Sequence, residues 1–297
     1  MSLTSANVPS FFATPTARLK MEKAYQTYLD RLPAGAELLS IDTSYGSTNV
    51  LRIGTPGDPA LVLLHARNAC APLAMHHFLD LLPHFRIYAI DLPGQPNLSV
   101  EIRLPPRTNA YGQWMHELLS KLGIWYANLV GIELGAYAAL KSLTFDARRV
   151  AAAYLVTPLG LHTSSKWQHY WRQQRLFTRF LRNPLSGNLD KLASRMWQER
   201  DDEMLGFWEE TLPNYSADLS YIPAIPHDNL SGLTTPIYCF VGSDDQYFSM
   251  RTEHLQIPSL QSTTVLPNCG YLPSPTAYAL IVKHLQNTFR EHRKDIV

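Results

Sequence analysis

The sequence predicts an α/β fold, with a mostly parallel central sheet flanked by helices and an inserted helical lid. Short apolar runs, typical of strands buried on both faces, alternate with segments of helical periodicity, which is the order of βαβ units. The alternation stops after Val156 and resumes only at Pro236, a gap too long for a structureless loop in a compact domain. We therefore expect a core domain made of residues 1–157 and 231–297, with a helical cap over residues 158–230.

The elements follow from local patterns taken in chain order. Thr14-Pro15 can cap and start a first helix, and two strands of alternating polarity form a hairpin connected at Gly46. Apolar runs predict further strands at 60–65, 86–91, 127–131, 150–156 and 236–242. Helical periodicity predicts helices at 73–82, 109–122, 133–145 and 275–294.

The cap sequence is rich in aromatic side chains at helical spacing. They are Trp167, Tyr170, Trp171, Phe177, Phe180, Trp197, Phe207 and Trp208. Such residues either line an apolar ligand site or form the core that a small helical lid needs for itself. The sequence leaves both interpretations open.

Composition excludes several classes of partner. The chain is 45% hydrophobic and 17% charged with a net charge of +1, so no basic surface favours nucleic acid. No apolar run approaches the roughly 20 residues of a membrane span, and no secretory signal is evident, so we expect a cytoplasmic protein without a membrane partner. Three scattered cysteines and the isolated histidines match neither a disulfide framework nor a metal site, and no cofactor is indicated. The oligomeric state stays open.

Two substituted motifs carry the functional signal. Gly131-Ile132-Glu133-Leu134-Gly135 joins a predicted strand to a predicted helix, the context of a nucleophile elbow, in which glycines make room for a sharp turn and the central side chain is held exposed. The central residue here is Glu133 rather than serine. Further along, Leu266 to Pro273 is similar to the loop that delivers a catalytic histidine, but Tyr271 follows Gly270.

Three more segments extend the similarity. His65-Ala66-Arg67-Asn68 follows a predicted strand and resembles a degenerate His-Gly oxyanion loop, and the turn from Asp91 to Ser99 follows the next strand. Gly242-Ser243-Asp244-Asp245 ends a later strand, before the loop that contains Tyr271. The order elbow, acid, base is that of an α/β-hydrolase. From about Leu38 onward the chain resembles the α/β-hydrolase superfamily, in its capped branch of esterases, C–C hydrolases and dehalogenases.

The resemblance assigns residues to the catalytic positions, but these residues do not make up a Ser-His-Asp triad. It places Glu133 at the nucleophile position, Asp245 at the acid and Tyr271 at the base. The backbone N–H groups of Arg67 and Leu134 are the implied oxyanion donors. His65 and Asn68, in the same oxyanion segment, are further candidate ligand contacts.

The substitutions leave three functional hypotheses. In the first, ordinary ester hydrolysis is lost, Glu133 accepts hydrogen bonds in its own oxyanion hole and from Tyr271, and the pocket binds a small apolar molecule or supports a non-hydrolytic acid/base step. In the second, Glu133 is a carboxylate nucleophile, although a tyrosine with a pKa of about 10 is a poor base for the water that must follow. The third is a non-catalytic, partner-binding protein, which a closed pocket filled by side chains would favour.

Overall fold

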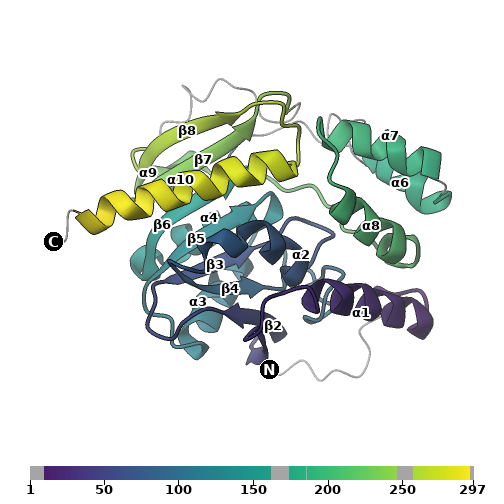
Figure 1. Ribbon diagram of the computed structural model, residues 1–297, viewed down its shortest axis with the longest axis horizontal. Helices are drawn as coiled ribbons and strands as arrows, with labels where there is room; N and C mark the ends of the chain where they lie inside the picture. Colours follow the sequence, from purple (N-terminus) through teal and green to yellow (C-terminus); the bar gives the residue numbers. More distant parts are fainter. Residues whose placement is uncertain (1–9, 162–173, 185, 246–256, 295–297) are drawn as a thin grey trace.

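A computed structural model of the chain describes residues 10–161, 174–184, 186–245 and 257–294. Within these ranges eight strands form one sheet in the order β1-β2-β4-β3-β5-β6-β7-β8 (Figure 1). The strands are β1 (Glu37–Thr43), β2 (Gly46–Ile53), β3 (Ala60–Leu64), β4 (Arg86–Ile90), β5 (Ala127–Ile132), β6 (Val150–Val156), β7 (Ile237–Gly242) and β8 (Leu260–Leu266). The α/β prediction is confirmed.

Parallel pairing brings the loops of the site together. Only β1 and β2 run antiparallel to their neighbours, whereas β4, β3, β5, β6, β7 and β8 are parallel. Leu64 at the end of β3 lies in register with Gly131 near the end of β5, and Gly242 at the end of β7 lies in register with Leu266 of β8. The loops that follow these strands therefore leave the same edge of the sheet.

Helices cover both faces of the sheet, and each face has its own hydrophobic core. One face packs against α1 (Pro15–Leu29), α2 (Ala71–Met75), the 3-10 helix η1 (His76–Leu81) and α10 (Pro275–Lys294). The other packs against α3 (Ala110–Lys121), α4 (Leu134–Phe145) and α9 (His227–Ser231). Within the described residues, no helix combines the length and apolar character needed to cross a bilayer.

Two local predictions need correction. The single helix expected over residues 73–82 is a short α2 followed by η1, and it starts earlier than expected because Pro72 occupies its first turn. Strand β8 was not among the strands predicted from apolar runs. Its sequence mixes Gln261, Ser262 and Thr263 with apolar residues, because an edge strand is exposed and needs no continuous apolar run.

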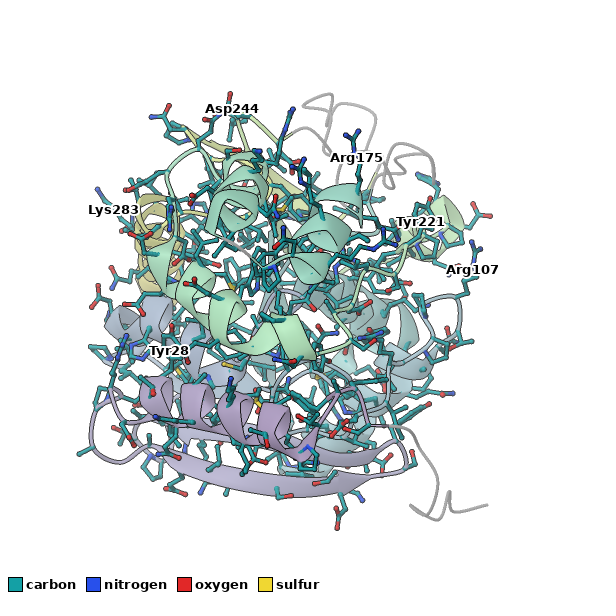
Figure 2. The ribbon with its side chains drawn as sticks, turned by 90° about the vertical axis from the view of Figure 1, so that its right-hand side faces the viewer. Tyr28, Arg107, Arg175, Tyr221, Asp244 and Lys283 are labelled. Carbon is teal, nitrogen blue, oxygen red and sulfur yellow. The ribbon has the colours of Figure 1, made fainter. Side chains whose placement is uncertain are left out.

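In the described part of the chain, the segment expected to form the cap contains α6 (Arg175–Arg182), α7 (Ser186–Met196), α8 (Asp202–Thr211) and the 3-10 helix η4 (Leu212–Asn214). Figures 1 and 2 show these helices gathered at one end of the sheet, next to α1. The Tyr28 hydroxyl of α1 donates to the Glu203 carbonyl of α8 at 2.8 Å, and the Trp197 indole donates to the Pro273 carbonyl at 3.1 Å. Trp167, Tyr170 and Trp171 lie outside the described residues, and the proposed domain limits stay a prediction.

The elbow glycines are required by close backbone contacts. A Cβ atom on Gly135 would lie 2.2 Å from the Leu64 carbonyl oxygen, and one on Gly131 would lie 2.5 Å from the Gly135 carbonyl oxygen. Neither contact is sterically possible without backbone movement. The elbow therefore packs directly against the end of β3, which fixes the position of residue 133 above the sheet.

We predict that Gly135→Ala lowers the free energy of unfolding by at least about 2 kcal/mol, because the added methyl group forces the elbow away from β3. Gly187→Ala in α7 is the matched control, since its Cβ would meet nothing within 4 Å. That change is expected to be neutral or to stabilise by up to about 1 kcal/mol. Urea denaturation of both variants checks this, and equal stabilities would contradict the packing argument.

Candidate active site

Glu133 occupies the apex of the elbow, between the last residue of β5 and the first of α4. Its backbone has φ 52° and ψ −102°, a conformation that is costly for a residue with a side chain, by about 1–3 kcal/mol. The residue is 1% exposed. The strained backbone geometry typical of an elbow is thus present at Glu133.

The Glu133 carboxylate accepts two hydrogen bonds from backbone N–H groups. Its Oε2 accepts hydrogen bonds from the Arg67 backbone N–H at 3.0 Å and from the Leu134 backbone N–H at 2.7 Å. These are the two backbone groups that the resemblance assigns as oxyanion donors, and their role as an oxyanion hole stays a prediction. Leu134 also stands at the positive end of the α4 dipole, which favours the carboxylate further.

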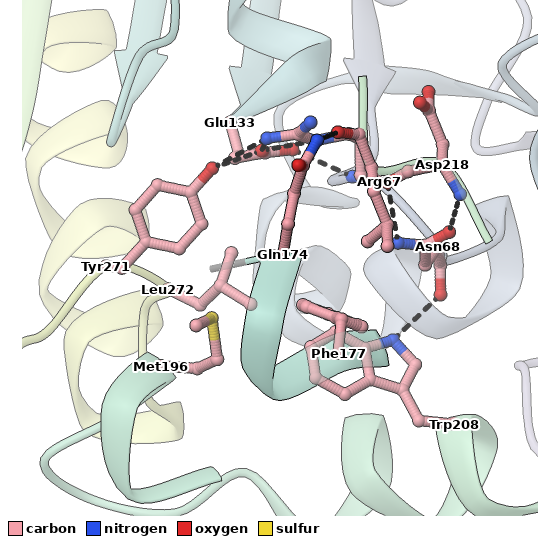
Figure 3. Close-up of a pocket in the computed structure, with 11 residues that line it drawn as sticks. Arg67, Asn68, Glu133, Gln174, Phe177, Met196, Trp208, Asp218, Tyr271 and Leu272 are labelled. Carbon is pink, nitrogen blue, oxygen red and sulfur yellow. Dashed lines mark hydrogen bonds and ion pairs between the residues drawn. The ribbon is translucent and has the colours of Figure 1, made fainter. Parts of the chain in front are cut away.

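The other carboxylate oxygen is occupied by two side chains (Figure 3). Glu133 Oε1 accepts a short hydrogen bond from the Tyr271 hydroxyl, as predicted, and one from Arg67 Nε at 2.7 Å. Arg67 Nη2 lies 2.6 Å from the same oxygen. The sequence assigned only a backbone role to Arg67, and the ion pair made by its side chain was missed.

Arg67 is a buried cation whose charge is secured by its surroundings. Burial alone would lower the pKa of its guanidinium, but Glu133, Tyr271 and Asp218 together raise that pKa well above its ordinary value. Arg67 Nη1 donates to the Ser220 carbonyl at 2.7 Å, and Nη2 donates to the Tyr271 hydroxyl at 3.1 Å. One side chain therefore connects the oxyanion loop, the elbow, the loop before α10 and the segment that leaves the cap.

Asn68 connects the same segment to the core. Its Oδ1 accepts from the Asp218 backbone N–H at 2.9 Å, and its carbonyl accepts from the Trp208 indole at 2.9 Å. Gln95 accepts from the Asn68 N–H at 2.8 Å and donates to the Asp218 carboxylate at 3.0 Å. Burial opposes ionisation of Asp218, but Arg67 and Arg103 lower its pKa below the ordinary value.

His65 is buried and hydrogen-bonded to the turn after β4, and its role as a ligand contact stays a prediction. Its Nε2 accepts from the Leu92 backbone N–H at 2.9 Å, and Nδ1 lies 2.7 Å from the Ala66 carbonyl oxygen. Burial lowers its pKa to about 4. The neutral ring holds the turn after β4 and does not line the cavity beside Glu133.

Asp245 lies in the turn after β7, and its backbone N–H donates to the Gly242 carbonyl at 3.3 Å. It is not among the residues that line the cavity. Burial, with Asp245 as the next contribution, raises the pKa of the Cys269 thiol to about 12, so this cysteine is an inert thiol. A position for Asp245 directly behind Tyr271 stays a prediction.

The cavity beside Glu133 is small, and it has a polar side and an apolar side. It is lined by Arg67, Asn68, Glu133, Gln174, Phe177, Met196, Trp208, Asp218, Leu219, Tyr271 and Leu272. Figure 3 shows Tyr271 and Arg67 converging on Glu133, with the apolar side chains gathered on the opposite side. The space open to the centre of a water molecule is about 20 Å³, room for one or two waters. Sequence reasoning missed Gln174 and Asp218, which carry no motif and lie in the cap or at its end.

Comparison with known proteins agrees with this architecture. Residues 61–282 match the model of the alpha/beta hydrolase family. The chain belongs to this family. It is 26% identical over 147 residues to carboxylesterase YbfK of Bacillus subtilis, and the match covers 50% of each chain. It is 28% identical over 137 residues to the uncharacterized carboxylesterase nap of the same organism, and that match covers 45% of this chain and 46% of the relative. The matched regions thus span about half the length of these relatives.

A solved structure extends the likeness to the whole fold. The naproxen esterase (carboxylesterase NP) from Bacillus subtilis superposes with a TM-score of 0.79 at 18% identity, covering 93% of this chain and 99% of that one. At this identity the likeness concerns the fold alone.

We predict strong energetic coupling between Arg67 and Glu133. Arg67→Met or Glu133→Gln alone leaves an uncompensated buried charge, which costs about 3–5 kcal/mol of stability. The double variant removes both charges and should cost less than the sum of the single changes by at least about 1 kcal/mol. Urea denaturation of the four proteins measures this difference. Additive costs would show that the two groups do not form an ion pair in solution.

Proposed function

We propose that this protein is a non-hydrolytic member of its family that acts through binding rather than turnover. The observation that carries the proposal is the Glu133 carboxylate in the oxyanion hole. Arg67 N, Nε and Nη2, Leu134 N and the Tyr271 hydroxyl all contact this carboxylate. The donors that a hydrolase aims at a developing negative charge are already occupied by a permanent one.

Ester hydrolysis lacks its usual nucleophile and base here. The elbow offers no hydroxyl, and the Tyr271 hydroxyl donates a hydrogen bond to Glu133 where a hydrolase has an imidazole base. An incoming carbonyl oxygen would have to displace Glu133 from both backbone donors. The side chains at the nucleophile and base positions, Glu133 and Tyr271, instead form a hydrogen-bonded ion-pair cluster with Arg67.

The alternative of a carboxylate nucleophile is poorly supported by this arrangement. Attack needs a carboxylate oxygen with a free lone pair pointing at the substrate, whereas both oxygens of Glu133 accept hydrogen bonds and Oε1 also pairs with a guanidinium. Breaking a buried pair of this kind costs about 3–5 kcal/mol, which slows attack by a factor on the order of 10²–10⁴. The mixed anhydride that attack of Glu133 on an ester carbonyl would form, with the alcohol as leaving group, would also lack a base to activate water.

The small size of the cavity favours a partner-binding role over small-molecule binding. A drug-sized ligand occupies a pocket of about 300–1,000 Å³, whereas the space beside Glu133 has room for one or two waters. Binding of a small apolar molecule is the second candidate function, because Phe177, Met196 and Leu272 offer it an apolar wall. That role requires α6 and α7 to move away from the core.

The direct test of lost hydrolysis is a steady-state assay with activated short-chain esters. We expect turnover at the rate of an unrelated protein control, unchanged by Glu133→Gln, because Glu133 takes no part in the reaction. A carboxylesterase serves as the positive control for the assay. Saturable turnover that Glu133→Gln abolishes would overturn the proposal and support a carboxylate nucleophile.

Restoring the missing groups should restore weak activity. The variant Glu133→Ser with Tyr271→His supplies a nucleophile and a base, and Arg67→Ala removes the guanidinium that would otherwise stay unpaired beside them. The matched control carries Glu133→Ala together with the same changes at Tyr271 and Arg67. We expect the serine variant to turn over esters at least roughly tenfold faster than this control, because the backbone N–H donors of Leu134 and residue 67 remain. Equal rates for the two would show that the oxyanion geometry no longer serves catalysis.

A further inference from the structure

The exposed surface of α6 consists of arginine side chains. Among the eight residues of this helix, those exposed to solvent are Arg175, Arg179 and Arg182. Phe177 and Phe180 are buried, and the other residues of the helix are partly buried. The three arginines follow one another at i, i+4 and i+7, which places them on one face of the helix. We call these three residues the α6 arginine row.

The neighbouring helix α7 adds to the positive charge. The two helices pack against each other (Figure 1), and α7 exposes Lys191 and Arg195 at i, i+4 spacing. The acidic residue of α7, Asp190, pairs with Arg200 at 2.9 Å. Together α6 and α7 contain five basic residues and one acidic residue, although the whole chain has a net charge of +1. The positive charge is therefore a local excess in a nearly neutral protein.

This arrangement of charges costs helix stability. Like charges three or four residues apart on a helix repel each other, as Arg179 does with the arginines on either side of it. The ion pairs among the described residues involve none of four of the basic side chains, namely Arg179, Arg182, Lys191 and Arg195. The helix dipole favours cations in the last turn of each helix, but Arg175 and Lys191 lie outside those turns. The charge pattern thus lacks a structural explanation and points to a binding role.

Helix α8 limits the shape of the anionic partner. It lies beside α6, since the rings of Phe177 in α6 and Trp208 in α8 have centroids 5.1 Å apart. Its exposed residues are all acidic, namely Asp202, Glu203, Glu209 and Glu210. A long nucleic acid or a flat anionic bilayer over α6 would also meet these acidic groups. A bilayer would further need exposed apolar side chains to insert, and the large exposed hydrophobic residues of the described structure include none in α6, α7 or α8.

We propose that the α6 arginine row binds an acidic segment of another protein. One extended chain is narrow enough to follow the row, which is about 10 Å long, without covering α8. Alternate side chains of an extended chain lie about 6.6 Å apart, close to the rise of about 6 Å between Arg175 and Arg179. Successive carboxylates can therefore meet successive guanidinium groups, each through two parallel hydrogen bonds.

The contact is electrostatic and has no apolar centre. The basic residues of α7 raise the positive potential beside the row and attract the acidic segment. Because the charged groups stay exposed to water, we expect the complex to be weak and to dissociate as the salt concentration rises.

The proposal goes beyond the loss of hydrolysis and does not depend on it. No residue of the α6 arginine row lines the cavity beside Glu133. A protein that hydrolyses esters and carries the same α6 would bind the same segment. The ester assay and the binding measurement therefore fail separately.

Fluorescence anisotropy with a labelled oligoglutamate peptide tests the proposal. We expect saturable binding at low salt, and the combined change Arg175→Gln, Arg179→Gln and Arg182→Gln should raise Kd at least about fivefold, because three exposed ion pairs are lost. Arg182→Gln alone should raise Kd at least about 1.5-fold, for the same reason. The triple variant should unfold thermally no earlier than the wild-type protein, because it removes repulsion between like charges.

The matched control makes the same change of net charge elsewhere on the surface. It combines Lys20→Gln, Lys23→Gln and Lys283→Gln, at exposed positions in α1 and α10, and should leave Kd within about twofold of the wild-type value because these charges are distant from the row. An equal loss of affinity in the two triple variants, or no saturable binding by the wild-type protein, would overturn the proposal.

Competing occupants are tested with the same variants. Tighter binding of the row to vesicles of phosphatidylcholine and phosphatidylserine, or to a short DNA duplex, would replace the acidic segment with lipid or nucleic acid and overturn the proposal. Sedimentation velocity of the protein alone tests a second copy, whose acidic α8 could also face α6. A dimer that the α6 substitutions dissociate would likewise contradict the proposal, and we expect none.

Discussion

The buried ion pair between Arg67 and Glu133 is the interaction on which the site depends. Removing two charges from water is costly, and such a pair persists only where hydrogen bonds satisfy the remaining donors and acceptors. Here the backbone of the oxyanion loop, the α4 amino terminus and Tyr271 satisfy Glu133, and the Ser220 carbonyl takes another donor of Arg67. Through the Ser220 carbonyl, this ion pair also links the segment around Ser220 to the elbow.

The hydrolase scaffold explains why the substitution is tolerated. An elbow holds residue 133 in a strained conformation and surrounds it with backbone donors, whatever its side chain is. The Glu133 side chain is long enough for its carboxylate to reach the Arg67 and Leu134 N–H groups. The cost of strain is then offset by hydrogen bonds inside the protein rather than by binding energy from a substrate.

Much of this could be predicted from the sequence, and the misses have physical reasons. Buried parallel strands give continuous apolar runs, so the sheet core and the elbow were identifiable, and the meeting of Glu133 with Tyr271 followed from the family resemblance. The path of the Arg67 side chain was not predictable, because a loop residue before a helix has many rotamers and its partners are distant in sequence. Asp218 lies in a segment without periodicity, and β8 lacks the apolar run that marks a buried strand.

The central claim is that the Glu133 carboxylate is engaged by its own protein and unavailable to a substrate. Peptide mass spectrometry after incubation with an activated ester, with rapid acid quenching, tests this at the residue itself. The account predicts that the peptide containing Glu133 keeps its unmodified mass at every time point. An adduct on Glu133, accumulating with time and absent from Glu133→Gln, would show a reactive nucleophile and contradict it.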